Sequence, residues 1–209
     1  MSIGDRLRKE TRDLHDAAEQ HAFQRSLFKG TLPREMYIAN LGQLYLVHKA
    51  LEARIRERIS DTPALAGVVR EYQFQEPYLA EDLAHFGVDI GSIQPVPATS
   101  ALIEKIERAA ETAPVALLGH HYVLEGSNNG SRYIARNVAK AYGLSMGGPG
   151  LRYLDPYGED QPAKWMEFKT DLLAVSLSES EQDIVVSAAR EMFSAIAAIG
   201  GELLEPQPA

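Results

Sequence analysis

Residues 33–59 read PREMYIANLGQLYLVHKALEARIRERI and carry the clearest periodicity in the chain. Pro33 suits the start of a helix, because the N–H that proline lacks would have no partner in the first turn. An α-helix has about 3.6 residues per turn, so side chains three and four residues apart share one face. This spacing places on one face the residues Leu41, Leu44, His48, Leu51, Ile55 and Ile59. The segment therefore predicts one long amphipathic helix.

Helical periodicity continues on both sides of this segment, and no alternation typical of strands runs for a useful length. Pro77 is expected to kink one helix near its middle, and residues 125–130 to interrupt another. Besides the helix after Pro33, we expect helices at residues 3–20, 64–86, 98–112, 114–143, 162–177 and 179–204. The prediction is an all-α bundle of about seven helices, a single domain over residues 1–209 with a frayed tail at 205–209.

Composition and charge exclude several classes of function. Of the 209 residues, 45% are hydrophobic and 24% are charged, which is ordinary for a soluble globular protein. The absence of cysteine excludes disulfides, thiolate metal sites, iron–sulfur clusters and a cysteine nucleophile. With 21 Lys and Arg against 29 Asp and Glu, the net charge of −8 argues against general nucleic-acid binding. The N-terminal residues carry no signal-peptide core, and no run of about 18 apolar residues occurs, so we expect a cytoplasmic protein without a membrane span.

The N-terminal helix carries a stripe of residues that suits a metal-containing ligand. Arg8, Arg12, His15 and Glu19 are spaced by four, three and four residues, which places them along one side of a helix. A neutral histidine can bind a metal through one ring nitrogen while a carboxylate accepts the N–H of the other. The arginines suit carboxylates, so haem with its two propionates fits the stripe. The alternative is a solvated face with ordinary helix salt bridges.

Two glycines break the pattern of the long segment at 114–143. Gly126 and Gly130 lie one turn apart on one face, where each glycine destabilises a helix by about 0.5–1 kcal/mol relative to alanine. They indicate a kink or a surface that a flat ligand approaches closely, and Ser127, Asn128 and Asn129 add groups that can hold ordered water. A close helix–helix crossing, or a break between two helices, is the alternative explanation.

Two further histidines have a structural and a functional explanation each. His48 lies on an otherwise apolar stripe, which favours a hydrogen-bonded histidine of the core. His121 precedes the glycine pair by about a turn, where it faces either the same pocket or the surface.

Three separated motifs resemble the haem oxygenase family, in order and with matching spacing over nearly the whole chain. The first is TRDLHDAAE at residues 11–19, continued by Phe23 to Gly30 and by Tyr45 and residues 50–52. The second is YVLEGSNNG at residues 122–130, which is similar to the glycine-rich distal helix of bacterial members. The third is DPYG at residues 155–158, followed by Trp165 and the pair Phe168–Lys169.

The resemblance implies a role for each matched residue. His15 is similar to the proximal ligand of the haem iron, and Gly126 and Gly130 to the glycines that let the distal helix lie close over the haem. The remaining cofactor-binding residues that it implies are Glu19, which would orient His15, together with Arg8, Arg12, His121, Tyr122 and Lys169.

The chain departs from the better-known animal members on the distal side. Ser127 stands where those members have an aspartate, His48 stands where they have a tyrosine, and their nearby distal arginine is not matched. The candidate substitutes are Ser127, Asn128, Tyr122 and His48.

The resemblance implies oxidative cleavage of haem, both cofactor and substrate, to biliverdin, carbon monoxide and ferrous iron. Oxygen and an external electron donor, a ferredoxin or a reductase, would be needed, since no flavin or dinucleotide motif occurs. A non-catalytic haem-binding or haem-trafficking protein is the main alternative. A thiaminase-like hydrolase on the same fold is disfavoured because it needs a cysteine nucleophile, and a purely structural helical protein would bind no haem.

Overall fold

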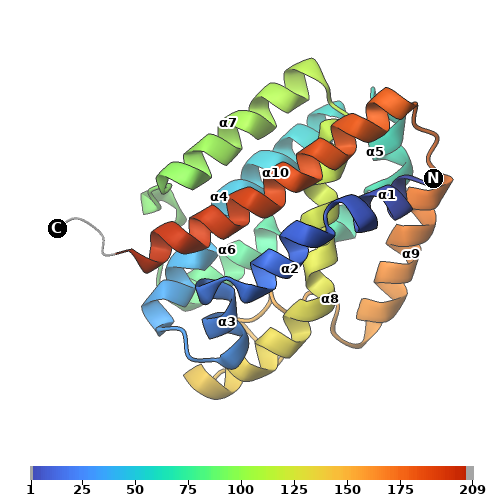
Figure 1. Cartoon of the computed structure of the whole chain (residues 1–209). Helices are drawn as coiled ribbons and strands as arrows, with labels where there is room; N and C mark the ends of the chain where they lie inside the picture. Colours follow the sequence, from blue (N-terminus) through green and yellow to red (C-terminus); the bar gives the residue numbers. More distant parts are fainter. Residues whose placement is uncertain (1, 206–209) are drawn as a thin grey trace.

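The computed structural model describes residues 2–205, and every regular element in that range is helical. Residues 206–209, most of the tail predicted to fray, lie outside the described residues. The α-helices, shown in Figure 1, are α1 (Ile3–Glu10), α2 (Arg12–Gln20), α3 (Ala22–Lys29), α4 (Arg34–Arg58), α5 (Pro63–Val68), α6 (Glu76–His85), α7 (Pro97–Thr112), α8 (Ala116–Tyr142), α9 (Gln161–Ala174) and α10 (Glu179–Leu204). Three short 3₁₀ turns join them at Glu71–Gln73 (η1), Ile90–Ser92 and Gly158–Asp160.

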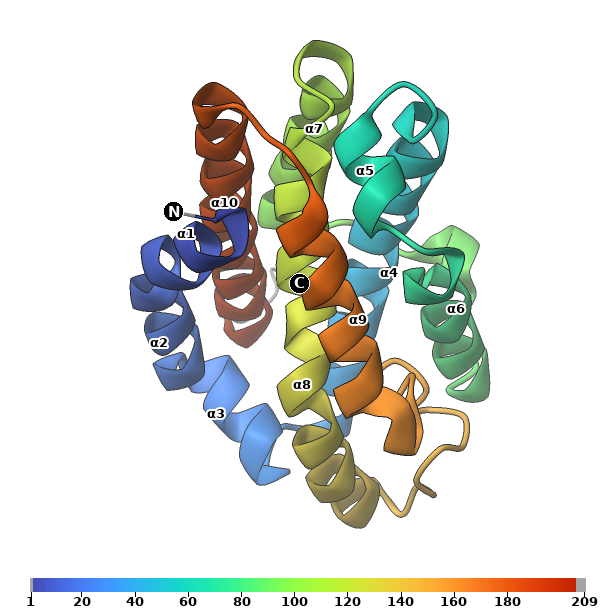
Figure 2. The same cartoon turned by 90° about the vertical axis from the view of Figure 1, so that its right-hand side faces the viewer.

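The core forms where the three long helices meet. Helix α8 packs along α10, while α4 packs against α6, α7, α8 and α10. Because neighbours surround α4, it buries more than the predicted stripe: Tyr37 and Val47 are fully buried beside Leu41, Leu51 and Ile55. Figure 2 shows α9 lying across α8, with α1, α2 and α3 following one another down one side. This arrangement leaves one face of α8 between the N-terminal helices and α9.

The described residues form ten α-helices, and the predicted number of about seven is wrong. The predicted helix at 3–20 divides at Thr11, where the backbone leaves helical geometry (φ −111°, ψ 0°) and the hydroxyl donates to Leu7 O at 2.8 Å. The predicted helix at 64–86 divides into α5, η1 and α6. Pro77 does not kink a helix there, because it occupies the first turn of α6, where a proline is tolerated. Helix α3 was not among the predicted helices.

The predicted interruption at residues 125–130 is also wrong. Helix α8 runs unbroken from Ala116 to Tyr142, and neither Gly126 nor Gly130 has a positive φ. Packing on α10 at one end and on α3 at the other supports the helix, and this offsets the modest helix penalty of the two glycines.

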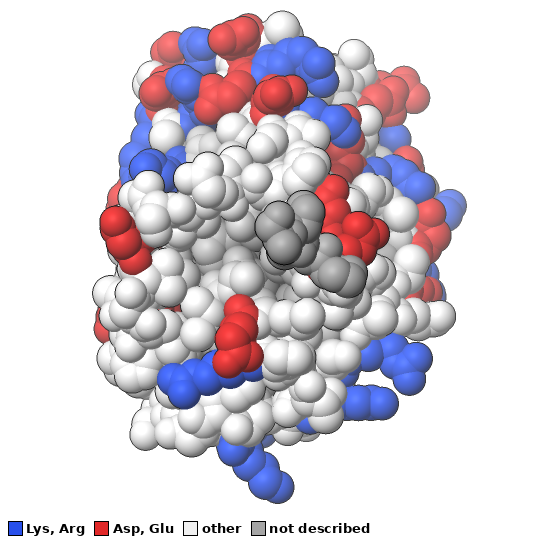
Figure 3. Space-filling model, turned by 90° about the vertical axis from the view of Figure 1, so that its left-hand side faces the viewer, with Lys and Arg blue, Asp and Glu red and all other residues white. Residues whose placement is uncertain are grey.

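Helix α10 is long and apolar enough to meet the length and composition of a membrane span, with an 18-residue window of mean hydropathy 1.4. Its apolar side packs on the other helices, where Val185, Ala189, Met192 and Ile199 are buried. Figure 3 shows one face of the molecule, on which uncharged side chains cover a broad central area and Lys and Arg lie among Asp and Glu at the upper edge. The net negative charge is therefore not concentrated on that face.

Candidate functional site

One face of α8 presents bare backbone to its surroundings. Tyr122, Gly126 and Gly130 are spaced by four residues, so they line one side of the helix, called here the glycine face. A Cβ added at Gly130 would meet no atom within 4 Å, and one at Gly126 would meet only Trp165 Cη2 at 3.7 Å. At Gly119, by contrast, a Cβ would lie 2.1 Å from Val185 O of α10. Gly119 therefore serves a helix crossing, whereas no helix packs closely on Gly126 or Gly130.

His15 lies on α2 with its ring half-exposed to solvent. Its Nδ1 is 3.7 Å from Glu19 Oε1 and 3.9 Å from Asp16 Oδ1, and its ring meets that of Phe193 on α10 edge to face, with 6.0 Å between centroids. Within residues 2–205, Nε2 has no hydrogen-bond partner. The ring thus turns one nitrogen toward carboxylates and keeps the other available to a ligand.

A cleft of about 330 Å³ brings three predicted cofactor-binding residues together from three helices. Arg8 of α1, Tyr122 of α8 and Lys169 of α9 line it, with Trp165 forming an aromatic wall. Lys169 Nζ lies 5.7 Å from the centroid of the Trp165 ring, which stacks on Phe168 at 5.5 Å. Burial raises the pKa of the Tyr122 hydroxyl, and the positive charge of Arg8 opposes that shift. The cleft therefore combines flat apolar surfaces with a cationic rim, which suits an aromatic anion.

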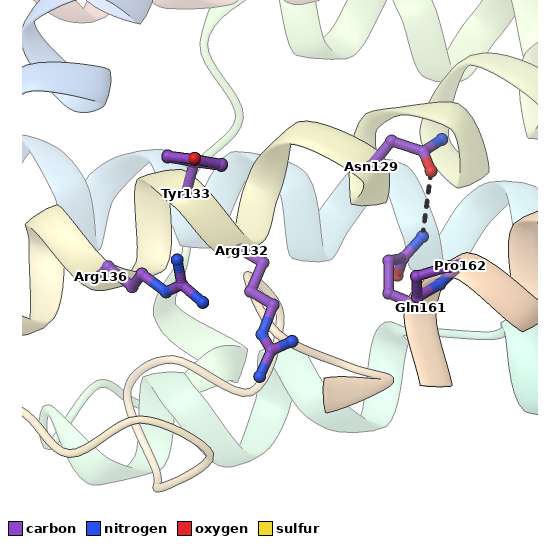
Figure 4. A pocket seen from close by; sticks show the side chains of 6 residues that line it. All are labelled: Asn129, Arg132, Tyr133, Arg136, Gln161 and Pro162. Carbon is purple, nitrogen blue, oxygen red and sulfur yellow. Dashed lines mark hydrogen bonds between the residues drawn. The ribbon is translucent and has the colours of Figure 1, made fainter. Parts of the chain in front are cut away.

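A second pocket of about 220 Å³ lies further along α8, at the start of α9 (Figure 4). Arg132 and Arg136 line it, and Gln161 donates to Asn129 Oδ1 at 3.5 Å. Arg132 pairs with Glu159, and its Nε lies 3.5 Å from Asp155 Oδ1. The glycine face is thus flanked by two pockets, each with two basic side chains. The sequence did not single out the residues of this second pocket as cofactor contacts.

The structure does not bring Arg12 into either pocket. Its side chain is 80% exposed, and its Nε lies 3.8 Å from Asp16 Oδ2. Arg12 lies one turn before His15 on α2. Its contact with Asp16 is that of an ordinary surface salt bridge, which was the alternative explanation of this stripe.

His121 points into the core and not into the cleft, contrary to the predicted contact with a propionate. Its Nε2 lies 3.0 Å from Gln73 Oε1, and its ring packs on Phe168 and Phe74. Burial lowers the pKa of His121 to about 3, so the ring is neutral and offers no positive charge to a carboxylate. Helix geometry explains why His121 does not reach the cleft. Adjacent residues are rotated by about 100° around the helix axis, and Tyr122 is the residue that lines the cleft.

Asn128 likewise faces away from the glycine face. It is buried and donates through Nδ2 to Glu125 Oε2 at 3.1 Å, while Tyr157 donates to the same oxygen at 2.9 Å. Burial raises the pKa of Glu125 to about 7, against the lowering effect of these two hydrogen bonds. The pair belongs to an internal polar cluster between α8 and the loop before α9.

Ser127 and His48 differ in exposure and in their contacts. Ser127 is exposed, and its hydroxyl donates to Leu124 O at 2.6 Å. His48 is buried and hydrogen-bonded, with Nδ1 2.8 Å from Glu52 Oε1 and Nε2 3.4 Å from the hydroxyl oxygen of Tyr153. The expectation of a hydrogen-bonded core histidine is therefore confirmed. Trp165 lines the cleft, and Tyr153 contacts His48.

Comparison with known proteins gives one consistent family. The family model described as Heme oxygenase matches residues 1–199. The chain is 26% identical over 200 residues to Heme oxygenase 2 of Synechocystis sp. PCC 6803, covering 92% of this chain and 79% of that protein. The structure of a heme oxygenase from Leptospira interrogans superposes with a TM-score of 0.89 at 27% identity, covering 97% of this chain and 100% of that one. The structure of heme oxygenase-2 from Synechocystis sp. PCC 6803, in complex with heme and NO, gives a TM-score of 0.90 at 25% identity, with 97% and 85% covered.

Proposed function

The chain belongs to the haem oxygenase family, and on that premise we propose that it cleaves haem, as cofactor and substrate, to biliverdin, carbon monoxide and ferrous iron with oxygen and external electrons. The observation that carries the proposal is the open glycine face. Two helix-interior glycines that no neighbouring helix requires have a role if a flat molecule lies against the backbone there. The cleft beside this face offers the cations and aromatic rings that such a molecule with carboxylates needs.

The residues present fit haem at both the iron and the propionates. We assign His15 as the iron ligand, since Nε2 is available and Nδ1 faces Glu19, whose carboxylate can accept the N–H and orient the ring. Arg8 and Lys169 are the propionate contacts, and Tyr122 adds a hydroxyl at the same cleft. Arg12 is exposed and within one turn of His15, where it can pair with a propionate.

Bound haem supplies the iron at which oxygen is activated, and the chain's own residues prepare its surroundings. Gly126 and Gly130 keep side chains away from the glycine face, so that the porphyrin and the backbone of α8 can come close. Ser127 offers a small hydroxyl beside Gly126 where the family's animal members carry an aspartate. Asn128 donates a hydrogen bond to the Glu125 carboxylate on the side of α8 away from the glycine face.

The remaining parts of the proposal concern partners, domain and location. Electrons come from a separate ferredoxin or reductase, because the chain carries no flavin or dinucleotide motif. The single buried cluster of apolar side chains supports one domain over residues 1–209. We place the protein in the cytoplasm, unattached to a membrane, since the apolar side of α10 is used in helix packing.

A haem-binding or haem-trafficking protein is the second candidate. The serine at position 127 favours it, because a side chain that lacks a carboxylate supplies fewer protons to the glycine face. The two candidates share the haem site and differ only in whether the bound ring is opened.

The test adds ferric haem to the purified protein, records the spectrum, and then supplies reductant and oxygen. We expect a histidine-type Soret band that decays into a biliverdin band, and loss of the first band in His15→Ala. His85→Ala, at an exposed histidine of α6, is the matched control and should keep both. A stable haem complex with no ring opening for several electron donors would support the carrier, and no haem band at all would contradict both.

A further inference from the structure

Helix α2, which carries His15, makes few apolar contacts with the rest of the protein. None of its residues is buried, and only Leu14 and Ala18 are half-buried. The break at Thr11 separates α2 from α1, so the two helices do not form one rigid rod. A helix with so little buried apolar surface depends on polar contacts to keep its place.

Arg190 of α10 supplies such a contact at the break. Its guanidinium donates to both carboxylate oxygens of Asp13, from Nη1 to Oδ1 at 2.8 Å and from Nη2 to Oδ2 at 2.9 Å. Nη1 also donates to the backbone oxygen of Glu10. Glu10 is the last residue of α1, and Asp13 lies in the first turn of α2. One planar side chain therefore spans the break and ties both helices to α10.

Helix α10 is a firm anchor for this contact because it belongs to the core. Ala189 and Met192 are fully buried on its inner side, and α8 packs against it. Phe193, three residues after Arg190, meets the His15 ring edge to face. Figure 1 shows α1 and α2 lying along α10. The helix that carries His15 and the helix that carries the glycine face are thus both placed against α10.

We propose that Arg190 is a positioning residue for the iron ligand: it clamps the first turn of α2 to α10 and so fixes where the His15 ring lies relative to the glycine face. The proposal rests on the proposed function, in which His15 binds the haem iron. Arg190 acts through Asp13 and the backbone of Glu10.

The geometry of this contact distinguishes it from an ordinary surface ion pair. The side chains of Arg190 and Asp13 are 41% and 62% exposed, and most ion pairs at such exposure contribute little. Here the pair is bidentate, and a third hydrogen bond reaches the end of α1. Three bonds from one guanidinium hold the break more tightly than a single contact between two charges.

Two substitutions of Arg190 and one control separate the clamp from the general loss of a surface charge. Arg190→Met removes the charge and keeps an unbranched side chain, while Arg190→Lys keeps the charge but not the planar fork. Arg54→Met is the matched control. Arg54 is 36% exposed and joins α4 to α7, with its Nε 2.5 Å from Glu107 Oε2.

The first measurement needs no haem. Amide hydrogen exchange of the apoprotein, read by mass spectrometry, reports how often α2 opens. Loss of an exposed ion pair of good geometry changes such an equilibrium by up to about fivefold, so with the bond to Glu10 also lost we expect exchange in residues 12–20 to rise about fivefold or more in Arg190→Met. Arg190→Lys should raise it less, and Arg54→Met should leave it unchanged. Unchanged exchange of α2 in Arg190→Met would overturn the clamp.

A double substitution tests whether Arg190 acts through Asp13. Asp13→Asn keeps the shape of the side chain and removes its charge. Combined with Arg190→Met, it should raise the exchange of α2 no further than Arg190→Met alone, because both substitutions remove the same contact. Effects that add in the double variant would refute this coupling.

The haem complex tests the consequence for His15. The iron–histidine stretching band of the ferrous complex, seen by resonance Raman spectroscopy, reports the bond between the ring and the iron. In Arg190→Met we expect this band to shift or broaden and haem to dissociate about fivefold faster, while Arg54→Met should match the wild type.

Two results would contradict different parts of the argument. A wild-type band and wild-type haem dissociation in Arg190→Met, with faster exchange in α2, would show that the clamp serves stability alone and would refute the positioning role. A histidine-type Soret band that survives in His15→Ala would refute the proposed iron ligand, and the amide exchange of the apoprotein would still decide whether Arg190 holds α2.

Discussion

Replacing Gly130 by alanine separates a ligand-binding surface from a packing surface. The added methyl group would meet no atom within 4 Å, so it introduces no clash into the apoprotein. Alanine in a helix interior is favoured over glycine by about 0.5–1 kcal/mol. The free energy of unfolding of the apoprotein should therefore rise by about that amount, measured by urea denaturation followed by circular dichroism.

Gly119→Ala is the matched control on the same helix. Its Cβ would lie 2.1 Å from Val185 O and 3.0 Å from both Ala188 Cβ and Ala189 N, so α8 and α10 must move apart. Overpacking of this kind destabilises proteins by about 1–3 kcal/mol, so the two alanines should change stability in opposite directions.

Substitution of Gly130 should weaken haem binding, although it does not destabilise the apoprotein. A larger side chain there, as in Gly130→Leu, projects from the glycine face and should weaken haem binding at least about tenfold, or about 1.4 kcal/mol, while the apoprotein stays folded. If Gly130→Ala destabilised the apoprotein as Gly119→Ala does, or if Gly130→Leu bound haem normally, the glycine face would not be a ligand surface.

Two further predictions use the cleft and the buried carboxylate. Burial raises the pKa of Glu125 from 4.5 to about 7, so its protonated form is favoured in the folded state. Stability is then fully present below about pH 4.5 and falls by about 3 kcal/mol as the pH rises through about 7. Glu125→Gln should remove that loss in urea unfolding at about pH 5 and about pH 8, and an unchanged pH dependence would contradict the assignment. Lys169→Ala should weaken haem binding about fivefold, and the effect should depend on salt concentration. Lys140 lies outside both pockets, so Lys140→Ala should leave haem binding unchanged. Equal effects of the two substitutions would show that Lys169 does not contact a propionate.

The long-range periodicity of the sequence predicted the main helices because a buried face must repeat about every 3.6 residues. Helix α10 has the predicted bounds, 179–204, and α7 begins one residue before the predicted 98–112. The break at Thr11 carried no such signal, since threonine is only mildly unfavourable in helices and the turn depends on its hydroxyl reaching Leu7 O. Short breaks of this kind explain the difference in helix number.

Sequence spacing predicted some of the residues of the candidate site and misplaced others. The predicted residues Arg8, Tyr122 and Lys169 come together because the helices α1, α8 and α9 converge, which residue spacing alone does not contain. His121 and Asn128 face other sides of α8, because a step of one or two residues changes the direction of a side chain on a helix. Tyr153 lies in an irregular segment, where no periodicity indicates that its hydroxyl meets His48.

The most direct test of the account is a single turnover of the haem complex with carbon monoxide measured as a product. With reductant and oxygen, and with catalase present to remove free peroxide, we predict carbon monoxide and biliverdin in amounts equal to the haem lost. Haem that stays intact, or that bleaches without releasing carbon monoxide, would contradict the account.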